Sequence, residues 1–317
     1  MENPLVSILV ATYNSARWVI ETLESAKNQT YRNIELVISD DCSTDNTVEL
    51  CKEWLIANEQ YFIRTVLITV EQNTGIAANA NRAIQESQGE WIKFVAGDDA
   101  LLNSCISDNL LFVFKFPECH ILQSNAKKYR DIFDEKYFIE NALYNKLFCS
   151  NSITALKQFR ILCFECPVVA PAIFIKRELL VQVGGFDTSF FIEDYPLWLK
   201  ITSLGYKIYY LDKPTVKYRL HNSSVMHSFS SCFYNLKLEL TLKAIKRTYI
   251  YPSISWYDLW FWESDFLYRI KFFVINSLFG NRNTFITRSV SNVLSCLNLY
   301  LLKKKILLLL IGLRNND

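Results

Sequence analysis

The first hundred residues alternate between short apolar runs and amphipathic segments, and this alternation restricts the fold more than any other feature. Four runs are predicted to be strands: Leu5–Ala11, Asn33–Ser39, Ile63–Val70 and Trp91–Val95. Leu5–Ala11 is apolar at six of its seven positions, which is typical of a parallel strand covered on both faces. Between the runs, apolar residues recur at helical spacing. Repeated strand–helix units predict an α/β fold with a mostly parallel central sheet and helices on both faces.

Capping residues predict where the three intervening helices begin. Ser15 is expected to cap the first helix, and Ser43 or Thr44 is expected to open the second. The third helix is expected directly after Gly75. We therefore expect three strand–helix units before the fourth strand.

Beyond Ala100 the pattern is weaker but still predicts helices and strands. Helices are expected at Asn103–Phe116, Arg177–Val183 and Asp194–Leu204, and strands at His120–Asn125, Ala172–Ile175, Tyr206–Leu211 and Thr215–Leu220. A turn at residues 212–214 is expected to separate the last two strands. From Ser231 the pattern is helical, although the leucines at 236, 238, 240 and 242 also fit a strand.

Polar side chains follow three of the four N-terminal strands, at the point where each strand ends. Thr12-Tyr13-Asn14 ends the first, Asp40-Asp41 the second and Asp98-Asp99 the fourth. In parallel sheets, ligands bind beyond the carboxyl ends of the strands. Carboxylate oxygens suit Mg²⁺ or Mn²⁺, and such a cation suits a diphosphate. Each cluster alone also fits a turn or a helix cap, but all three together favour a binding site.

Cysteines and the N-terminus indicate a reducing compartment. The nine cysteines are scattered, and Cys163 and Cys166 lack the second pair that a zinc site needs. The opening residues, Met-Glu-Asn-Pro, do not read as an export signal. We therefore expect a cytoplasmic protein with reduced thiols.

The C-terminal residues carry a different charge balance from the rest. Residues 235–317 contain 12 Lys and Arg against 5 Asp and Glu, and the remaining residues carry 22 against 27. This part is rich in aromatic residues, and its apolar run Leu301–Ile311 is shorter than the roughly 20 residues of a membrane-spanning helix. We expect residues 231–317 to form a helical extension that associates with an anionic membrane surface. A helical appendage with a basic solvent face is the alternative, and no nucleic-acid-binding pattern is present.

Three segments together resemble glycosyltransferase family 2. They are Ser7–Asn14, Val37–Asp45 and Gly97-Asp98-Asp99. The resemblance runs from about Val6 to Val225 and is closest to bacterial enzymes that build O-antigen or capsule repeat units. It implies a GT-A fold for residues 1–230, a nucleotide-diphospho-sugar donor and inversion at the anomeric carbon.

The resemblance also implies which residues bind the donor. Ala11 and Tyr13 are expected to line the pocket for uracil and ribose, and Asp41 to accept the N3–H of uracil. Asp98 is expected near the ribose, and Asp99 is expected to coordinate Mn²⁺ or Mg²⁺. Such a cation would neutralise the departing diphosphate.

Two later segments resemble the family's acceptor and diphosphate regions. In Glu193-Asp194-Tyr195-Pro196-Leu197-Trp198, the resemblance makes Asp194 the base that deprotonates the acceptor hydroxyl. A helix N-cap is the alternative role for Asp194. In Tyr218-Arg219-Leu220-His221, Arg219 is expected to touch phosphate and His221 to be a further metal ligand.

One position departs from the family pattern. Many relatives carry an Arg in the helix after Asn-x-Gly, where this chain has Ala80. Either Arg82 substitutes for that Arg, or the metal and Arg219 carry the charge alone.

The expected function is therefore an inverting, metal-dependent hexosyltransferase. It would move glucose or galactose from a UDP-sugar to a polyprenyl-diphosphate-linked saccharide of the GlcNAc type, forming a β-linkage, at the inner face of the cell membrane. A sugar nucleotidyltransferase is one alternative, but it predicts a Gly-rich phosphate loop that residues 11–15 do not form. A non-catalytic UDP-sugar-binding protein is the other, and the presence of Asp41, Asp99 and Asp194 disfavours it.

Overall fold

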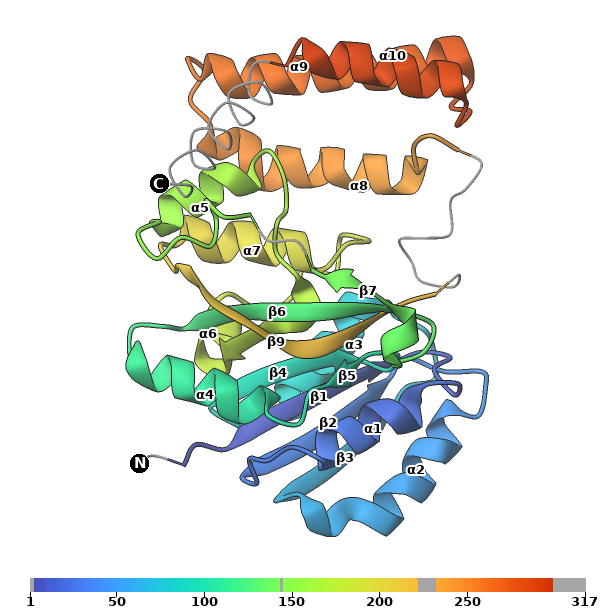
Figure 1. Cartoon of the computed structure of the whole chain (residues 1–317), viewed down its shortest axis with the longest axis vertical. Helices are drawn as coiled ribbons and strands as arrows, with labels where there is room; N and C mark the ends of the chain where they lie inside the picture. Colours follow the sequence, from blue (N-terminus) through green and yellow to red (C-terminus); the bar gives the residue numbers. More distant parts are fainter. Residues whose placement is uncertain (1–2, 143–144, 222–231, 299–317) are drawn as a thin grey trace. The chain divides into compact units, whose positions relative to one another are not determined.

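The chain forms two compact units, Met1–His221 and Asn222–Asp317. The structure is a computed structural model, and it describes residues 3–142, 145–221 and 232–298 (Figure 1).

A sheet runs through the first unit and has nine strands among the described residues, in the order β3-β2-β1-β4-β8-β6-β9-β5, with β7 pairing to β6. The first four strands are parallel: β1 (Val6–Thr12), β2 (Ile34–Asp40), β3 (Arg64–Thr69) and β4 (Trp91–Ala96). Every residue of β2 is buried, as expected for a parallel strand covered on both faces. These four predicted strands are confirmed, and their carboxyl ends share one edge of the sheet.

The second half of the sheet mixes parallel and antiparallel pairs. It contains β5 (Ala100–Leu101), β6 (Ile121–Arg130), β7 (Phe138–Asn141), β8 (Ile173–Lys176) and β9 (Ile208–Leu220). β8 is antiparallel to both β4 and β6, whereas β9 is parallel to β6. Two strands separated by a turn at residues 212–214 were expected here, and that prediction is wrong. β9 is continuous, because the proline at 214 falls where the β6–β9 register shifts and a missing N–H is tolerated.

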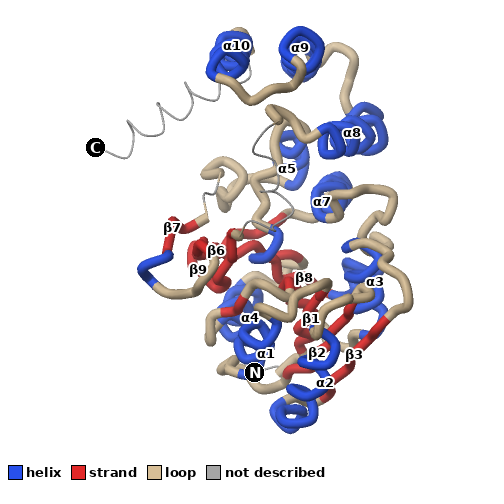
Figure 2. The backbone as a smooth tube through the Cα atoms, turned by 90° about the vertical axis from the view of Figure 1, so that its right-hand side faces the viewer, coloured by secondary structure: helices blue, strands red, loops and turns tan. Residues whose placement is uncertain are grey.

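Helices cover both faces of the sheet, as predicted, with α3 on the opposite face from α1 and α4 (Figure 2). The α-helices of this unit are α1 (Val19–Lys27), α2 (Thr47–Asn58), α3 (Ile76–Glu86), α4 (Cys105–Lys115), α5 (Ala155–Leu162), α6 (Arg177–Gln182) and α7 (Asp194–Ser203). Short 3₁₀ turns lie at Glu59–Tyr61, Glu135–Tyr137 and Ala170–Ala172. The sequence pattern predicted α4, α6 and α7 but not α5.

Two of the three predicted helix starts are wrong. Trp18, not Ser15, precedes α1, and the Ser15 carbonyl accepts from the N–H of Trp18 at 2.8 Å. Asn46 precedes α2, whereas the Ser43 hydroxyl donates to the carboxylate of Asp40 at 2.5 Å. In both loops the predicted capping residue forms hydrogen bonds within the turn that follows the strand and does not cap the helix. Gly75 precedes α3, as predicted.

The second unit is helical, as predicted, including the leucines at 236–242. It contains α8 (Leu236–Ile245), a π-helical turn η4 (Lys246–Ile250), a 3₁₀ turn η5 (Tyr251–Ser253), α9 (Leu259–Phe273), a π-helical turn η6 (Val274–Leu278) and α10 (Phe285–Cys296). Buried Asp265 ties its segments together, accepting from Lys246 at 2.8 Å, Arg269 at 2.8 Å and Tyr251 at 3.0 Å. The apolar run Leu301–Ile311 lies outside the described residues. Among the helices that are described, none is long and apolar enough to cross a membrane.

Candidate active site

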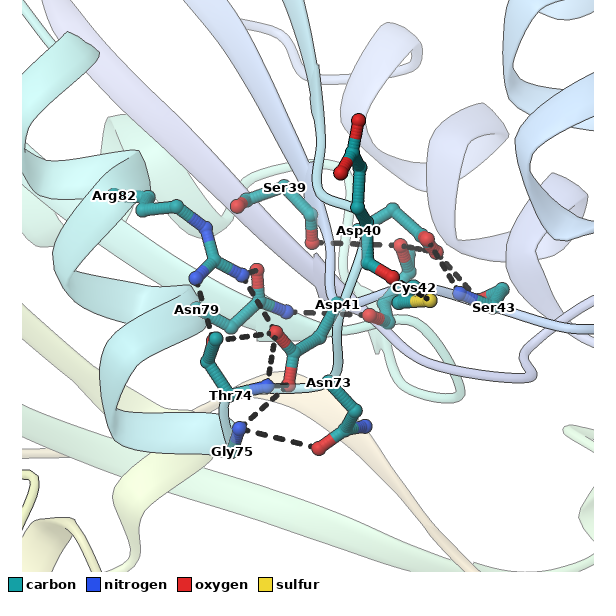
Figure 3. A network of polar contacts seen from close by, with 12 residues as sticks. Ser39, Asp40, Asp41, Cys42, Ser43, Asn73, Thr74, Gly75, Asn79 and Arg82 are labelled. Atoms are coloured by element: carbon teal, nitrogen blue, oxygen red, sulfur yellow. Dashed lines mark hydrogen bonds and ion pairs between the residues drawn. The ribbon is translucent and has the colours of Figure 1, made fainter.

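Asp41 stands directly after β2 and is the centre of a dense polar cluster (Figure 3). Its Oδ1 accepts from Thr74 Oγ1 at 2.7 Å and from Arg82 Nη2 at 2.7 Å, and its Oδ2 accepts from the N–H of Gly75 at 2.7 Å. The N–H of Thr74 is 3.1 Å from both oxygens. Burial alone would raise the pKa of Asp41, but the donors from Arg82, Thr74 and Gly75 lower it. Asp41 is therefore held ionised and in one orientation.

The neighbouring polar residues mainly hold the loops that frame Asp41. The carboxylate of Asp40 accepts from Thr12 Oγ1 at 2.9 Å and from the N–H of Ser43 at 2.8 Å. Asn14, with φ of 51°, accepts from the N–H of Thr44 at 2.8 Å. These bonds join the loop after β1 to the loop after β2. Asp40 therefore has a structural role, because its carboxylate joins these two loops.

Asp98 and Asp99 follow β4 and meet the end of β9. The antiparallel pairing of β5 with β9 brings them beside the final residues of that strand. Oδ1 of Asp99 accepts from the N–H of Arg219 at 2.8 Å, and Oδ2 of Asp98 lies 2.9 Å from Nε2 of His221. Burial and the charge of Asp98 raise the pKa of Asp99 well above its usual range. A cation beside this pair would relieve both effects.

Arg219 is buried and holds the carboxylate pair in place. Its Nε donates to the carbonyl of Asp98 at 2.6 Å, and its Nη2 pairs with the carboxylate of Glu21 at 2.5 Å. Its Nη1 donates to the carbonyl of Asp131. The guanidinium lies 4.1 Å from the ring centroid of Trp18 and 3.8 Å from that of Phe133. All three nitrogens are thus engaged within the protein, and the Arg219 side chain supports the segments that carry Asp98 and Asp131.

Asp194 begins α7 and is not the N-cap, since that position belongs to Glu193. Its Oδ1 accepts from the N–H of Tyr195 at 2.7 Å. Burial raises the pKa of Asp194, and burial together with the charge of Asp194 raises the pKa of Glu193. A carboxylate with a raised pKa is a better proton acceptor than an ordinary surface carboxylate.

The phenol of Tyr218 lies within the electrostatic influence of the predicted base and of the carboxylate pair. Burial, followed by the charges of Asp99, Asp98 and Asp194, raises its pKa to about 12.

The loop that precedes α7 is fixed to α3 by a single amide side chain. Asn81 Nδ2 donates to the carbonyl of Phe186 at 2.8 Å, and Asn81 Oδ1 accepts from the N–H of Phe186 at 2.9 Å. Gly185, with φ of +70°, lies so close that an added Cβ would be 2.5 Å from Asn81 Oδ1. The helix that borders the Asp41 cluster thus also positions the segment leading to Asp194.

The residues present suit a cation that is shared with a phosphate ligand. Among the described residues there is no group of three or more His, Cys, Asp or Glu side chains placed to hold a metal. Asp98, Asp99 and His221 are nevertheless of the right chemical type, and burial together with the charge of Asp98 raises the pKa of Asp99 despite the opposing charges of Arg219 and Lys93. Mg²⁺ is usually bound by one or two carboxylates together with substrate phosphates.

The structure distributes the remaining predicted residues around this edge. Ala11, near the end of β1, pairs in register with Ser39 of β2 and Ala96 of β4, and Tyr13 beyond it is half exposed. Sequence reasoning missed Glu21, Trp18 and Phe133, which surround Arg219, and Thr74, which binds Asp41. Thr74 lies inside the Asn-x-Gly segment that the pattern did single out. No local signal marks the others, because their partner is far away in the chain.

The chain is similar to glycosyltransferases in sequence and in fold. Residues 7–180 match the family model described as glycosyl transferase family 2. The chain is 31% identical over 226 residues to the Escherichia coli UDP-Glc:alpha-D-GlcNAc-diphosphoundecaprenol beta-1,3-glucosyltransferase WfaP, covering 70% of this chain and 79% of WfaP. It is 25% identical over 227 residues to the putative teichuronic acid biosynthesis glycosyltransferase TuaG of Bacillus subtilis (strain 168), covering 70% of this chain and 81% of TuaG.

Solved structures show the same fold. The crystal structure of S. aureus TarS 1-349 in complex with UDP-GlcNAc matches with a TM-score of 0.59 at 22% identity, covering 76% of this chain and 65% of that chain. The match therefore spans slightly less than two thirds of the TarS chain. The predicted GT-A fold is confirmed.

Proposed function

This chain belongs to glycosyl transferase family 2, and from that premise we propose that it transfers a hexose from a UDP-sugar to a saccharide linked to polyprenyl diphosphate. The observation that carries the proposal is the arrangement of Asp41, Asp98 and Asp99 beyond the carboxyl ends of β2 and β4, at one edge of the sheet, with Nε2 of His221 2.9 Å from Oδ2 of Asp98. Glucose or galactose is the proposed donor sugar, and the relative WfaP, whose name specifies UDP-Glc and a GlcNAc-diphosphoundecaprenol acceptor, supports glucose and a GlcNAc-type acceptor. The product would enter an O-antigen or another surface polysaccharide.

The proposed reaction is a single displacement. The acceptor hydroxyl oxygen attacks the anomeric carbon, the bond from that carbon to the UDP oxygen breaks, and Asp194 takes the hydroxyl proton. An α-linked donor therefore gives a β-linked product. Asp41 accepts a hydrogen bond from the nucleobase and fixes the donor, with Ala11 and Tyr13 beside it. Arg219 holds the carboxylate pair in place through its N–H to Asp99 and its Nε to the carbonyl of Asp98.

A divalent cation is part of the proposal. Asp99 and Asp98, with His221, are the residues that would hold Mn²⁺ or Mg²⁺, and the bound ion would supply Lewis-acid stabilisation of the departing diphosphate.

We further propose that residues 1–230 form the catalytic part and that residues 231–317 attach it to the inner face of the cell membrane. Large side chains are exposed on the second unit, including Trp256 at 83%, Tyr257 at 68% and Phe285 at 84%. Aromatic residues on a basic surface suit the interface of an anionic bilayer, where the lipid-linked acceptor is found. Co-sedimentation with anionic and with zwitterionic vesicles tests this, and equal binding to both would contradict it.

A transfer assay tests the proposed reaction. The protein is incubated with Mn²⁺, each of several UDP-sugars and a lipid-diphosphate GlcNAc acceptor, and the glycosylated product is measured. We expect one UDP-hexose to give product, Asp194→Asn to abolish it, and Asp212→Asn, a change at an exposed carboxylate, to leave it unchanged. An absence of product from every UDP-sugar, or an Asp194→Asn variant as active as the wild type, would refute the proposal.

A further inference from the structure

Arg82 occupies one oxygen of the carboxylate that is proposed to recognise the nucleobase. A carboxylate offers about four acceptor positions, two on each oxygen. On Asp41, Oδ1 already accepts from Arg82 Nη2 at 2.7 Å and from Thr74 Oγ1 at 2.7 Å. Oδ2 accepts from the N–H of Gly75 at 2.7 Å and shares the N–H of Thr74 with Oδ1. Oδ1 thus holds two donors of its own and Oδ2 holds one, so Oδ2 is the less crowded oxygen and the one that the base can approach.

The Arg82 guanidinium is fixed in this position by several contacts. Its Nη1 donates to Thr74 Oγ1 at 2.6 Å, and its Nη2 also donates to Asn79 Oδ1 at 3.1 Å (Figure 3). The Arg82 side chain is 20% exposed and that of Asp41 is 3% exposed. An ion pair with this degree of burial keeps its geometry better than a surface pair. Arg82 therefore acts on Asp41 and is not directed toward a diphosphate.

The number of acceptor positions decides which bases the carboxylate can bind. Uracil presents one donor, its imide N3–H, between two carbonyl acceptors. Guanine presents two adjacent donors, N1–H and the N2 amino group, which a carboxylate binds with both oxygens at once. A guanine at this site would place its second donor against Oδ1, where Arg82 and Thr74 already lie. A buried donor left without an acceptor weakens binding substantially.

We propose that Arg82 is a specificity-determining residue that excludes guanine nucleotides, because it blocks Oδ1 of Asp41 and limits this carboxylate to a single imide donor. The inference rests on the proposed function, since it assumes that Asp41 meets the base of the donor. The departure from the family pattern at Ala80 and Arg82 thus concerns the base and not the diphosphate.

The relative affinity for UDP and GDP tests whether Arg82 excludes guanine nucleotides. The dissociation constants of UDP and GDP, each with Mg²⁺, are measured by calorimetry for the wild type and for Arg82→Met. We expect the wild type to prefer UDP, and the preference to fall at least about tenfold in Arg82→Met, mainly because GDP binds more tightly. Thr74→Val, which removes the other donor to Oδ1, is expected to shift the preference in the same direction.

Arg64→Met is the matched control. Arg64 also pairs with a buried carboxylate, that of Glu35 at 3.1 Å, but at the start of β3, on the opposite edge of the sheet. We expect it to change the melting temperature and not the UDP-to-GDP ratio. A general loss of structure would weaken the binding of UDP and of GDP together. The ratio of their dissociation constants therefore separates a change in selectivity from a change in folding.

The outcomes are distinguishable. The inference is overturned if Arg82→Met and Thr74→Val fold, still bind UDP and keep the wild-type ratio of the UDP and GDP dissociation constants. That result would leave the proposed function standing. If Arg82→Met does not fold, Thr74→Val alone decides. A wild type that binds neither nucleotide would refute the proposed function and the inference with it.

Discussion

Replacing Arg219 with Met distinguishes a positioning residue from a phosphate ligand. Methionine fills much of the same space but cannot donate the hydrogen bonds to the carbonyls of Asp98 and Asp131. It also removes the ion pair with Glu21 and the guanidinium from its place between Trp18 and Phe133. If these contacts support the site, the substitution lowers the free energy of unfolding even when no ligand is bound.

The expected loss is about 3–5 kcal/mol, the lower part of the range of about 3–10 kcal/mol that the following contributions sum to, because neighbouring contacts are not additive. Each carbonyl deprived of its donor costs about 1–3 kcal/mol where it is buried. The two cation–π contacts contribute about 0.5–2 kcal/mol each. We discount the Glu21 pair, because the Glu21 side chain is 49% exposed and water replaces its partner. For a chain of this size, such a loss lowers the melting temperature by on the order of 10 °C.

Denaturant unfolding and the KM for the UDP-sugar are measured together. Arg130→Met is the control, because Arg130 lies opposite Leu220 on the neighbouring strand β6 but is exposed, and we expect a change within about 0.5 kcal/mol. The reasoning is refuted if Arg219→Met unfolds like the wild type and instead raises the KM for the donor. That result would mean that Arg219 binds the diphosphate.

Three further predictions concern the acceptor side of the site. Asp194→Asn is expected to reduce kcat by about 10³-fold or more while the dissociation constant of UDP stays unchanged, and a weakened UDP affinity would place Asp194 elsewhere in the mechanism. Because burial raises the pKa of Asp194, this base is ionised only at a higher pH than an ordinary carboxylate. We therefore expect kcat/KM to fall about tenfold per pH unit below that pKa. A pH profile of kcat/KM that stays flat down to about pH 4 would contradict this prediction. Gly185→Ala is expected to raise the KM for the acceptor, because the new Cβ would meet Asn81 Oδ1. Gly205 also has a positive φ, +93°, but open space surrounds it, so Gly205→Ala is expected to lower thermal stability alone.

The sequence was most informative where the chain repeats one local rule. Parallel strands with short connections place their carboxyl ends on one edge, so Asp41 and Asp99 could be placed at the same edge of the sheet from the strand pattern. The antiparallel half of the sheet follows no such rule. The break predicted at residues 212–214 was wrong because pairing with β6 keeps the strand continuous through the proline.

Long-range partners limited what could be predicted about the site. Arg219 pairs with the carboxylate of Glu21, which is 198 residues away, and no sequence pattern near either residue predicts this pair. The hydroxyls of Ser15 and Ser43 suit a helix cap, but they form hydrogen bonds within the loops instead: Ser15 Oγ accepts from the N–H of Tyr13, and Ser43 Oγ donates to the carboxylate of Asp40. Tertiary contacts therefore changed the roles of residues whose location at the sheet edge had been predicted.

The two halves of the site become available at different times as the chain is made. The cluster around Asp41 is complete once residue 82 has been synthesised, and it depends on contacts within the parallel strands. The hydrogen bond to the carboxylate of Asp99 comes from the N–H of Arg219, which follows 120 residues later in the chain. Contacts of such separation are slow to form, so folding is expected to proceed from the Asp41 cluster towards the carboxylate pair. In a nascent chain the Asp41 cluster would thus form before Asp99 takes its final position.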